Sequence, residues 1–306
     1  MPETDKPGLP LSGLDGGNLL GFLAAVGTLR TATLAEPCCD WRMKWVSRGG
    51  LWSPALVTTR GIVPENLIAL LESTLNRSAP EFEFDKNLSV SPDRFREVAR
   101  KAQHCSSPRR RETADFIAAF GCDVMVADDG KSIQDTAFRT MSGAGHQHFL
   151  GTMKQLVKET TASDLQKSLF EPWTYTDRKL GLRWDPQEDR RYALRWDNPS
   201  GSGGVPTMRG ANRLAVEALP LLPTTPDRKR LETTGFSASG RAITFSWPIW
   251  DCAIGIEVVR SVLAMGEIQV SEPDRSKLQA QSIVEVYRSQ RFTVGKYRNF
   301  ALAHPA

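Results

Sequence analysis

The chain has 306 residues, of which 40% are hydrophobic and 24% are charged, and this composition is typical of a folded protein with an apolar core. The net charge of +4 permits a nucleic-acid partner without requiring one. No apolar run approaches the roughly 20 residues that span a bilayer, and residues 1–6 do not resemble a secretory signal. We therefore expect a cytoplasmic protein without a membrane partner.

The first predicted element is a helix over residues 19–30. Asn18 is well placed to cap it, and nearly all of its residues are apolar, so we expect it to be buried on most sides. Gly21 and Gly27 lower its intrinsic helix propensity. They therefore indicate close packing of its backbone against a neighbour.

Periodicity and turn residues predict the remaining elements. Strands are expected over residues 41–46 and 51–57, separated by a turn at the Gly-Gly pair, and further strands over 241–247 and 283–300. Helices are expected over residues 64–75, 91–102, 112–120, 146–159, 209–219 and 254–265. This order indicates an α+β fold with a helix-rich region 1–170 and a strand- and loop-rich region 171–306, or one continuous domain.

The five cysteines do not suggest a disulfide framework or a zinc site. Their number is odd, Cys38 and Cys39 are adjacent, and no C-x-x-C spacing occurs. We expect reduced, mostly buried thiols, and no cofactor.

An imperfect repeat is the most unusual feature of the sequence. Residues 182–185 and 194–197 both read Leu-Arg-Trp-Asp, and a charged segment separates them. We expect two short strands or loop arms that form a hairpin and place two sets of indole, guanidinium and carboxylate side by side. Trp184 and Trp196 then either stack against a nucleic acid or pack in the core.

No hydrolase, phosphate-loop or dinucleotide motif is found. Residues 201–204 are rich in glycine but lack the following Lys-Ser/Thr, so a simple loop is expected. Asp128 and Asp129 are compatible with Mg²⁺, although they lie in a turn sequence. His146 and His148 have a spacing that places them on opposite faces of a helix, so we expect surface and capping roles for them.

Basic residues cluster in two places. The run over 109–111 precedes a predicted helix, where it either is solvated or contacts phosphate. Basic and aromatic residues alternate through 287–300. That mixture suits a nucleic-acid surface, and it equally suits a strand with one face on the core.

Several segments resemble proteins from type I-G CRISPR loci, formerly called type I-U. They are residues 13–30, 185–194 and 210–221, followed by 233–236 and 247–250. The family that these segments resemble is the helicase-nuclease-extension proteins, which are related to the large-subunit-like proteins of the same subtype. The resemblance implies a subunit or partner of a crRNA-guided DNA surveillance complex. Helicase and HD nuclease motifs do not occur in the sequence, so no catalytic or metal-binding residue is carried over.

We therefore predict a non-enzymatic, nucleic-acid-binding subunit of a Cascade-like type I complex in antiviral defence. Its expected partners are crRNA or target DNA, other CRISPR effector subunits and the helicase-nuclease. The predicted contact residues are Arg109, Arg110, Arg111, Arg183, Arg190, Arg191, Arg195, Arg209, Arg213, Arg288, Arg291, Lys296 and Arg298. The alternatives are a metal-dependent nuclease that uses Asp128, Asp129 and His146, and a purely protein–protein adaptor.

Overall fold

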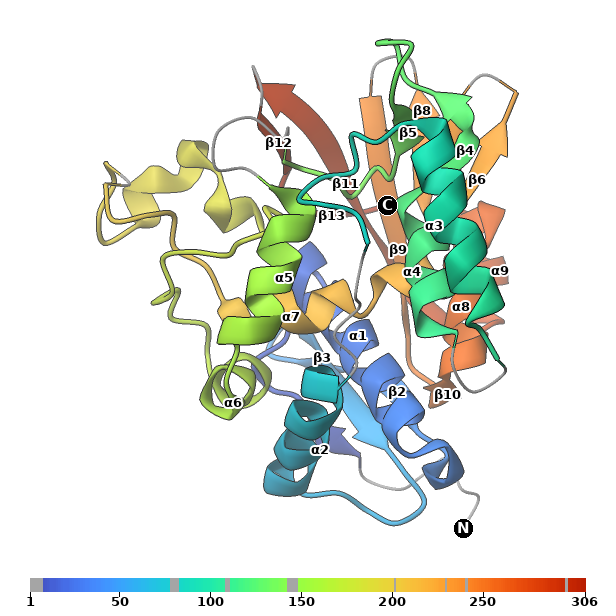
Figure 1. The fold of residues 1–306 in the computed structure, drawn as a ribbon. Coiled ribbons are helices and arrows are strands. Elements are labelled where there is room, and N and C mark those ends of the chain that lie inside the picture. Colours follow the sequence, from blue (N-terminus) through green and yellow to red (C-terminus); the bar gives the residue numbers. More distant parts are fainter. Residues whose placement is uncertain are drawn as a thin grey trace.

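The computed structural model describes residues 8–77, 83–107, 111–141, 148–200, 202–228, 230–239, 242–294 and 297–306 (Figure 1). The helices are α1 (Leu19–Ala35), α2 (Pro64–Arg77), α3 (Pro92–His104), α4 (Glu112–Phe120), α5 (Phe149–Glu159), α6 (Ala162–Phe170), α7 (Arg209–Val216), α8 (Ile256–Leu263) and α9 (Arg275–Gln279). Short 3-10 helices are η2 (Pro37–Cys39), η3 (Pro186–Glu188), η4 (Arg190–Arg195), η5 (Leu219–Leu221) and η6 (Gly266–Ile268).

The strands are β1 (Leu9–Pro10), β2 (Arg42–Arg48), β3 (Leu51–Val57), β4 (Gly121–Val126), β5 (Ile133–Asp135), β6 (Thr224–Asp227), β7 (Arg230–Thr233), β8 (Phe236–Ser239), β9 (Ala242–Trp250), β10 (Ile254–Gly255), β11 (Ile283–Val294), β12 (Tyr297–Phe300) and β13 (His304–Pro305). Helices are concentrated in the first half and sheets lie mostly later, which confirms the predicted α+β class.

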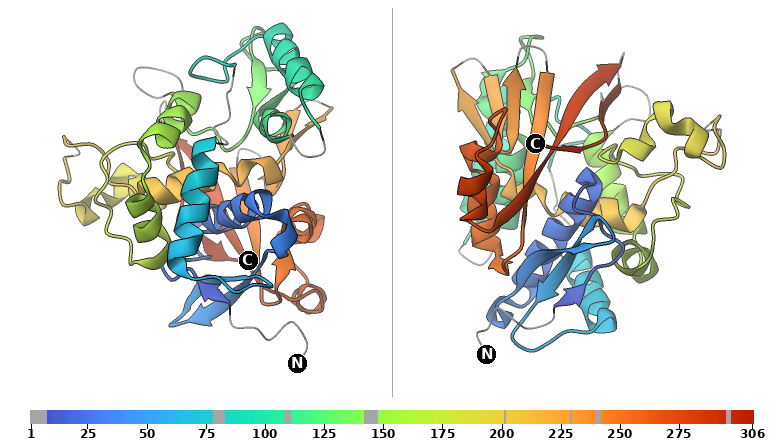
Figure 2. Two further views of the ribbon diagram at one scale, coloured as in Figure 1. Left: turned by 60° about the horizontal axis from the view of Figure 1, so that its bottom comes forward. Right: turned by 180° about the vertical axis from the view of Figure 1, so that it is seen from behind.

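Two antiparallel sheets form most of the strand structure in the described residues. One has the order β1-β3-β2-β10, and the other has the order β12-β11-β9-β8, with β13 paired to β11. Two-stranded pairs β4-β5 and β6-β7 lie near the second sheet (Figure 2). The expected Gly-Gly turn between β2 and β3 is confirmed, because Gly49 and Gly50 have φ angles of 57° and 84°.

Helix α1 is the centre of the core. Asn18 caps it by accepting a hydrogen bond from the Gly21 amide at 3.1 Å, and residues 19–32 are all buried, as the sequence predicts. The ring of Phe22 lies 5.8 Å from the rings of both Trp45 in β2 and Trp247 in β9. Through this one side chain, α1 connects the two sheets.

Helices α1 and α7 are in unusually close contact. A Cβ atom built at Gly27 would lie 1.9 Å from the carbonyl oxygen of Leu214, a separation that no side chain can tolerate. Gly27 therefore allows the two backbones to meet, as its position in the sequence suggests.

A buried ion triad lies at the same contact. Glu217, just after α7, accepts hydrogen bonds from Arg30 of α1 at 2.7 Å and from Arg213 of α7 at 2.8 Å. All three side chains are 5% exposed or less. The Arg213 guanidinium also donates to the carbonyl oxygen of Leu75, so the triad holds the end of α2 as well.

The larger of two buried clusters extends across both predicted regions. It includes Leu11 and Phe22 from the first region and Trp184, Leu214 and Phe300 from the second. The boundary near residue 170 therefore does not coincide with a break in the core.

The cysteine expectation is only partly confirmed. All five cysteines are free. Cys38 and Cys105 are exposed and only Cys39 is buried, so the prediction that most of the thiols are buried is wrong. Within the described residues, no helix has the length and apolar character needed to cross a membrane.

We expect Glu217→Ala to lower the free energy of unfolding by about 3–5 kcal/mol, because it leaves two buried guanidinium groups without their carboxylate. Urea unfolding followed by tryptophan fluorescence measures the loss. Glu232→Ala is the control, because its pair with Arg230 is about half exposed and should contribute less than about 1 kcal/mol. Equal losses in the two variants would contradict the role of the triad.

Candidate nucleic-acid interface

The Leu-Arg-Trp-Asp repeat does not form the expected hairpin. Residues 182–198 contain no strand; the 3-10 helix η3 follows the first copy, and η4 runs into the first two residues of the second copy. Asp185 accepts a hydrogen bond from the Gln187 amide at 2.9 Å, and Asp189 accepts one from the Arg191 amide at 2.8 Å. Because aspartates in such positions cap turns and Pro186 fixes its own φ, the sequence forms two capped turns instead. We call residues 185–197 the arm.

Both repeat tryptophans anchor the arm and neither lies free on its surface. Trp184 is fully buried, and its indole Nε1 donates to the carbonyl oxygen of Phe138 at 3.0 Å. Trp196 is 7% exposed and donates to the carbonyl oxygen of Gln187 at 2.8 Å. Of the two roles considered for these residues, Trp184 packs in the core, whereas Trp196 is buried against the arm itself.

Two buried carboxyl groups lie where the arm enters the core. Asp185 accepts hydrogen bonds from the Tyr175 hydroxyl at 2.8 Å and from the Asn18 side chain at 3.3 Å. Burial raises the pKa of Asp185, although these hydrogen bonds oppose the shift. Glu188 accepts from the Arg183 amide at 2.7 Å, and burial raises the pKa of Glu188 to about 7. Neither role was predicted, although aspartate before proline is a recognisable turn signal.

The outer side of the arm carries alternating cationic and aromatic groups. The Arg191 guanidinium carbon lies 3.8 Å from the ring centre of Phe292 in β11 and 5.8 Å from that of Tyr192. The Arg195 guanidinium carbon also lies near the Tyr192 ring, 5.4 Å from its centre. We call Arg195, Tyr192, Arg191 and Phe292 the cation–aromatic ladder. It brings together two segments that are about 100 residues apart in sequence.

The ladder is accessible from solvent. The Arg191 side chain is 52% exposed even though it pairs with Asp189 at 3.0 Å. Arg190 and Arg195 are exposed, and Leu194 between them is 93% exposed. Three of the predicted contact arginines are therefore exposed within one short segment of the arm.

Arg291 and Arg298 line a separate cavity of about 550 Å³. Arg291 and Phe292 are consecutive in β11, so their side chains leave opposite faces of the strand and Arg291 does not join the ladder. Arg291 donates to the carbonyl oxygen of Ala137 at 2.7 Å. Burial, together with the charge of Arg298, lowers the pKa of Arg291 to about 10.

Two predicted contact residues have structural roles. Arg213 is 2% exposed and belongs to the buried triad with Glu217, so it lies too deep for a nucleic acid and its assignment was wrong. Arg288 is partly buried and donates to the carbonyl oxygens of Ser271, at 2.7 Å, and of Val270. That guanidinium binds the loop before α9.

The remaining predicted residues are scattered. Arg209 lies between Asp164 and Asp177, at 3.7 and 3.4 Å, and is 25% exposed. Arg111 is 63% exposed and pairs with Asp115 at the start of α4, which is distant from the arm in sequence. Arg109, Arg110 and Lys296 lie outside the described residues.

The acidic pair considered for a nuclease lies in the turn between β4 and β5. The Ser132 hydroxyl and the Ser132 and Lys131 amides donate to the Asp129 carboxylate and lower its pKa to about 2, while Asp128 is exposed. The predicted turn is confirmed. In the described part of the chain, no three His, Cys, Asp or Glu side chains are placed to hold a metal ion. His146 lies outside that part.

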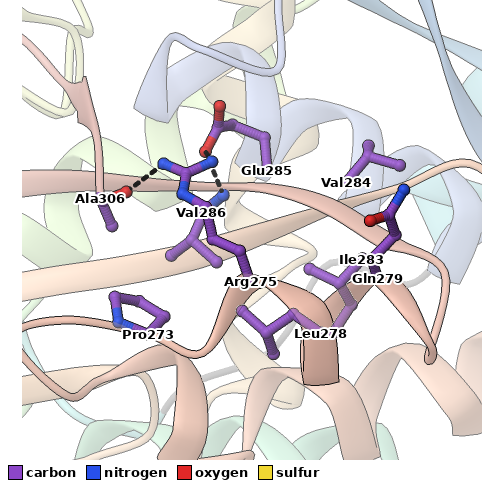
Figure 3. A pocket seen from close by; sticks show the side chains of 9 residues that line it. All are labelled: Pro273, Arg275, Leu278, Gln279, Ile283, Val284, Glu285, Val286 and Ala306. Atoms are coloured by element: carbon purple, nitrogen blue, oxygen red, sulfur yellow. Dashed lines mark hydrogen bonds and ion pairs between the residues drawn. The ribbon is translucent and has the colours of Figure 1, made fainter.

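A smaller cavity, of about 180 Å³, lies between α9 and β11 (Figure 3). Arg275 donates to the carbonyl oxygen of Ala306 and pairs with Glu285 at 3.2 Å. Leu278 and Ile283 belong to a small buried cluster beneath them. Because its charged groups already bind one another, we assign this cavity no ligand.

The ladder is therefore the candidate interface, because it contains two exposed predicted contact residues, Arg191 and Arg195. Its aromatic members fall within the segments singled out from the sequence, but only the fold places Phe292 beside Arg191. No protein-family model and no curated protein sequence matches the chain.

We expect Phe292→Ala to loosen the arm, since it removes the ring on which Arg191 stacks, a contact worth about 0.5–2 kcal/mol. Hydrogen–deuterium exchange in peptides covering residues 186–196 should become faster, while exchange in α1 stays unchanged. Phe292→Tyr keeps the ring and is the control. Unchanged exchange in the alanine variant would show that the stack does not hold the arm.

We expect Glu188→Gln to alter the pH dependence of stability. The pKa of Glu188 in the folded protein, about 7, lies above its ordinary value of 4.5, so the folded state binds the proton more tightly. This contribution is fully present below about pH 4.5 and is lost as pH rises through 7, a change of up to about 3 kcal/mol. Unfolding free energies from pH 4 to 8 should therefore fall more steeply in the parent than in the variant. Parallel curves would contradict the assignment.

Proposed function

We propose that the protein binds nucleic acid through the cation–aromatic ladder and the exposed arginines beside it. The observation that carries this proposal is the alternation of Arg195, Tyr192, Arg191 and Phe292 on an exposed surface. Guanidinium groups contact phosphates, and both guanidinium planes and aromatic rings stack on bases. Such a surface suits a single strand or an unpaired segment.

The same segment contributes to the resemblance to type I-G CRISPR proteins, which supports a more specific role. We infer a non-catalytic subunit of a crRNA-guided, Cascade-like surveillance complex that acts in the cytoplasm. Its partners would be crRNA or target DNA and other effector subunits. In such complexes base pairing to the guide reads the sequence, while protein supplies phosphate contacts and stabilises the displaced strand.

An adaptor role is the second candidate, and one observation favours it. Leu194 in the arm is 93% exposed, and an exposed apolar side chain suits a protein partner such as the helicase-nuclease. The two roles differ in whether the isolated protein binds nucleic acid. An adaptor binds its protein partner in the absence of DNA and RNA, and its complex is insensitive to the loss of arginines.

We expect Arg190→Glu with Arg195→Glu to weaken binding of a labelled single strand by at least about tenfold in low salt, measured by fluorescence anisotropy. Two lost phosphate contacts should also reduce the slope of log affinity against log salt by about 1.5. These positions leave the Arg191–Phe292 stack in place. Single-stranded DNA, RNA and duplex DNA are compared to identify the preferred strand.

The control is Arg48→Glu with Arg60→Glu, which makes the same charge change at exposed positions near β2 and β3. Equal weakening in both double variants would mean that only net charge matters. If the parent protein binds no strand but still joins the other subunits, the adaptor role replaces the proposal. Metal-dependent cleavage that is lost in Asp128→Ala would instead establish the nuclease.

A further inference from the structure

A second cavity, of about 780 Å³, lies at the base of the arm. It is bounded by α5, by the segment 178–183, by residues 85 and 86, and by Glu188 of η3. Figure 1 shows α5, in green, beside the yellow segment that leads into the arm. Its volume falls within the range of about 300–1,000 Å³ that is typical of small-molecule sites. None of the motifs in the sequence indicated it.

The walls of this cavity are predominantly cationic. The basic side chains that line it are Lys86, Lys154, Arg178, Lys179 and Arg183, against the two acids Asp85 and Glu188. Lys154 donates to main-chain carbonyl oxygens and Arg178 pairs with an aspartate of the arm, whereas Lys86 and Lys179 are exposed. An anionic group is therefore the ligand chemistry that the wall favours.

Glu188 gives the cavity a buried hydrogen-bonding group. One carboxylate oxygen accepts from the Thr207 hydroxyl at 2.5 Å and from the Asn212 side chain at 3.4 Å, and the other accepts from the Arg183 amide at 2.7 Å. A carboxylate has about four acceptor sites, so these three donors leave room for a ligand N–H. Gly181 makes space for the group, because a Cβ atom there would lie 2.4 Å from Oε2.

The backbone of the cavity wall is strained. Leu180 and Arg183 have φ angles of 70° and 59°, in the left-handed region that residues with a side chain rarely adopt. Such strain concentrates at ligand sites. Both residues line the cavity.

We propose that this cavity binds a nucleotide, with Lys86 and Lys179 on its phosphate and the Glu188 carboxyl on an amino or ring N–H of its base. The size of the cavity, its cationic wall and its one buried carboxyl together fit a ligand with an anionic group and a base with N–H donors. The nucleotide is either free or part of a bound strand. The first source is independent of the proposed function, and the second depends on it.

Isothermal titration calorimetry of the purified full chain with AMP, CMP, GMP and UMP tests the free ligand. We expect at least one of them to bind with a dissociation constant below about 1 mM. Lys86→Ala with Lys179→Ala should weaken it by at least tenfold, whereas Lys158→Ala with Lys167→Ala, which removes the same charge from exposed positions outside the cavity, should leave it unchanged.

Glu188→Gln separates base recognition from phosphate recognition. It should change the ranking of the four nucleotides while weak binding of inorganic phosphate stays within twofold of the parent. Thermal unfolding of each variant confirms that it is folded. An unchanged ranking, or equal affinity in the two lysine double variants, would overturn the proposal.

A strand with one abasic position tests the second source. If a strand nucleotide enters the cavity, the parent should bind the abasic strand several-fold less tightly than the intact strand. The Glu188→Gln variant should bind the two strands with equal affinity. Loss of strand binding in the Arg190→Glu, Arg195→Glu variant with retained mononucleotide binding would support a cavity site that is independent of the ladder. Absence of both mononucleotide binding and any abasic effect would overturn the cavity site, even if the ladder still binds strands.

Discussion

The contact between α1 and α7 is the constraint on which the positions of the functional segments depend. Gly27 lets the two backbones approach, and the buried triad of Arg30, Arg213 and Glu217 fixes their relative position. Helix α7 also carries Asn212, whose side chain accepts from the Leu182 amide and donates to Glu188. The geometry of the central helix pair is thereby transmitted to the base of the arm.

The arm combines a polar buried side with a cationic outer side. Burying Asp185 and Glu188 is unfavourable unless their oxygens find donors, and the hydrogen bonds that they accept make the path of the chain into the arm well defined. The turns that Asp185 and Asp189 cap leave Arg190 and Arg195 exposed, while Arg191 reaches the ring of Phe292. The ladder thus lies on the outer side of the arm, and Glu188 of the same arm lines the cavity at its base.

The candidate site was only partly predictable. The arginines of the arm are dense in the sequence, and all three are exposed. Arg213 belongs to an equally basic stretch, yet it is buried, because Glu217 one helical turn away and the carbonyl oxygen of Leu75 satisfy its guanidinium. The sequence did not predict Lys86 and Lys179 as contact residues, because they are far apart in the chain and only the fold brings both to the wall of one cavity.

Local sequence determined helices such as α1 and α3 and the turn between β2 and β3, because Asn18, Ser91 and the Gly-Gly pair act on neighbouring backbone groups. It did not indicate α6, α9 or β4 to β8. Tertiary structure decided what each element faces. The two Leu-Arg-Trp-Asp copies show the difference: Leu182 is fully buried, whereas Leu194 is 93% exposed. The same four residues have two environments because burial depends on tertiary neighbours, and a four-residue sequence does not specify which residues those neighbours are.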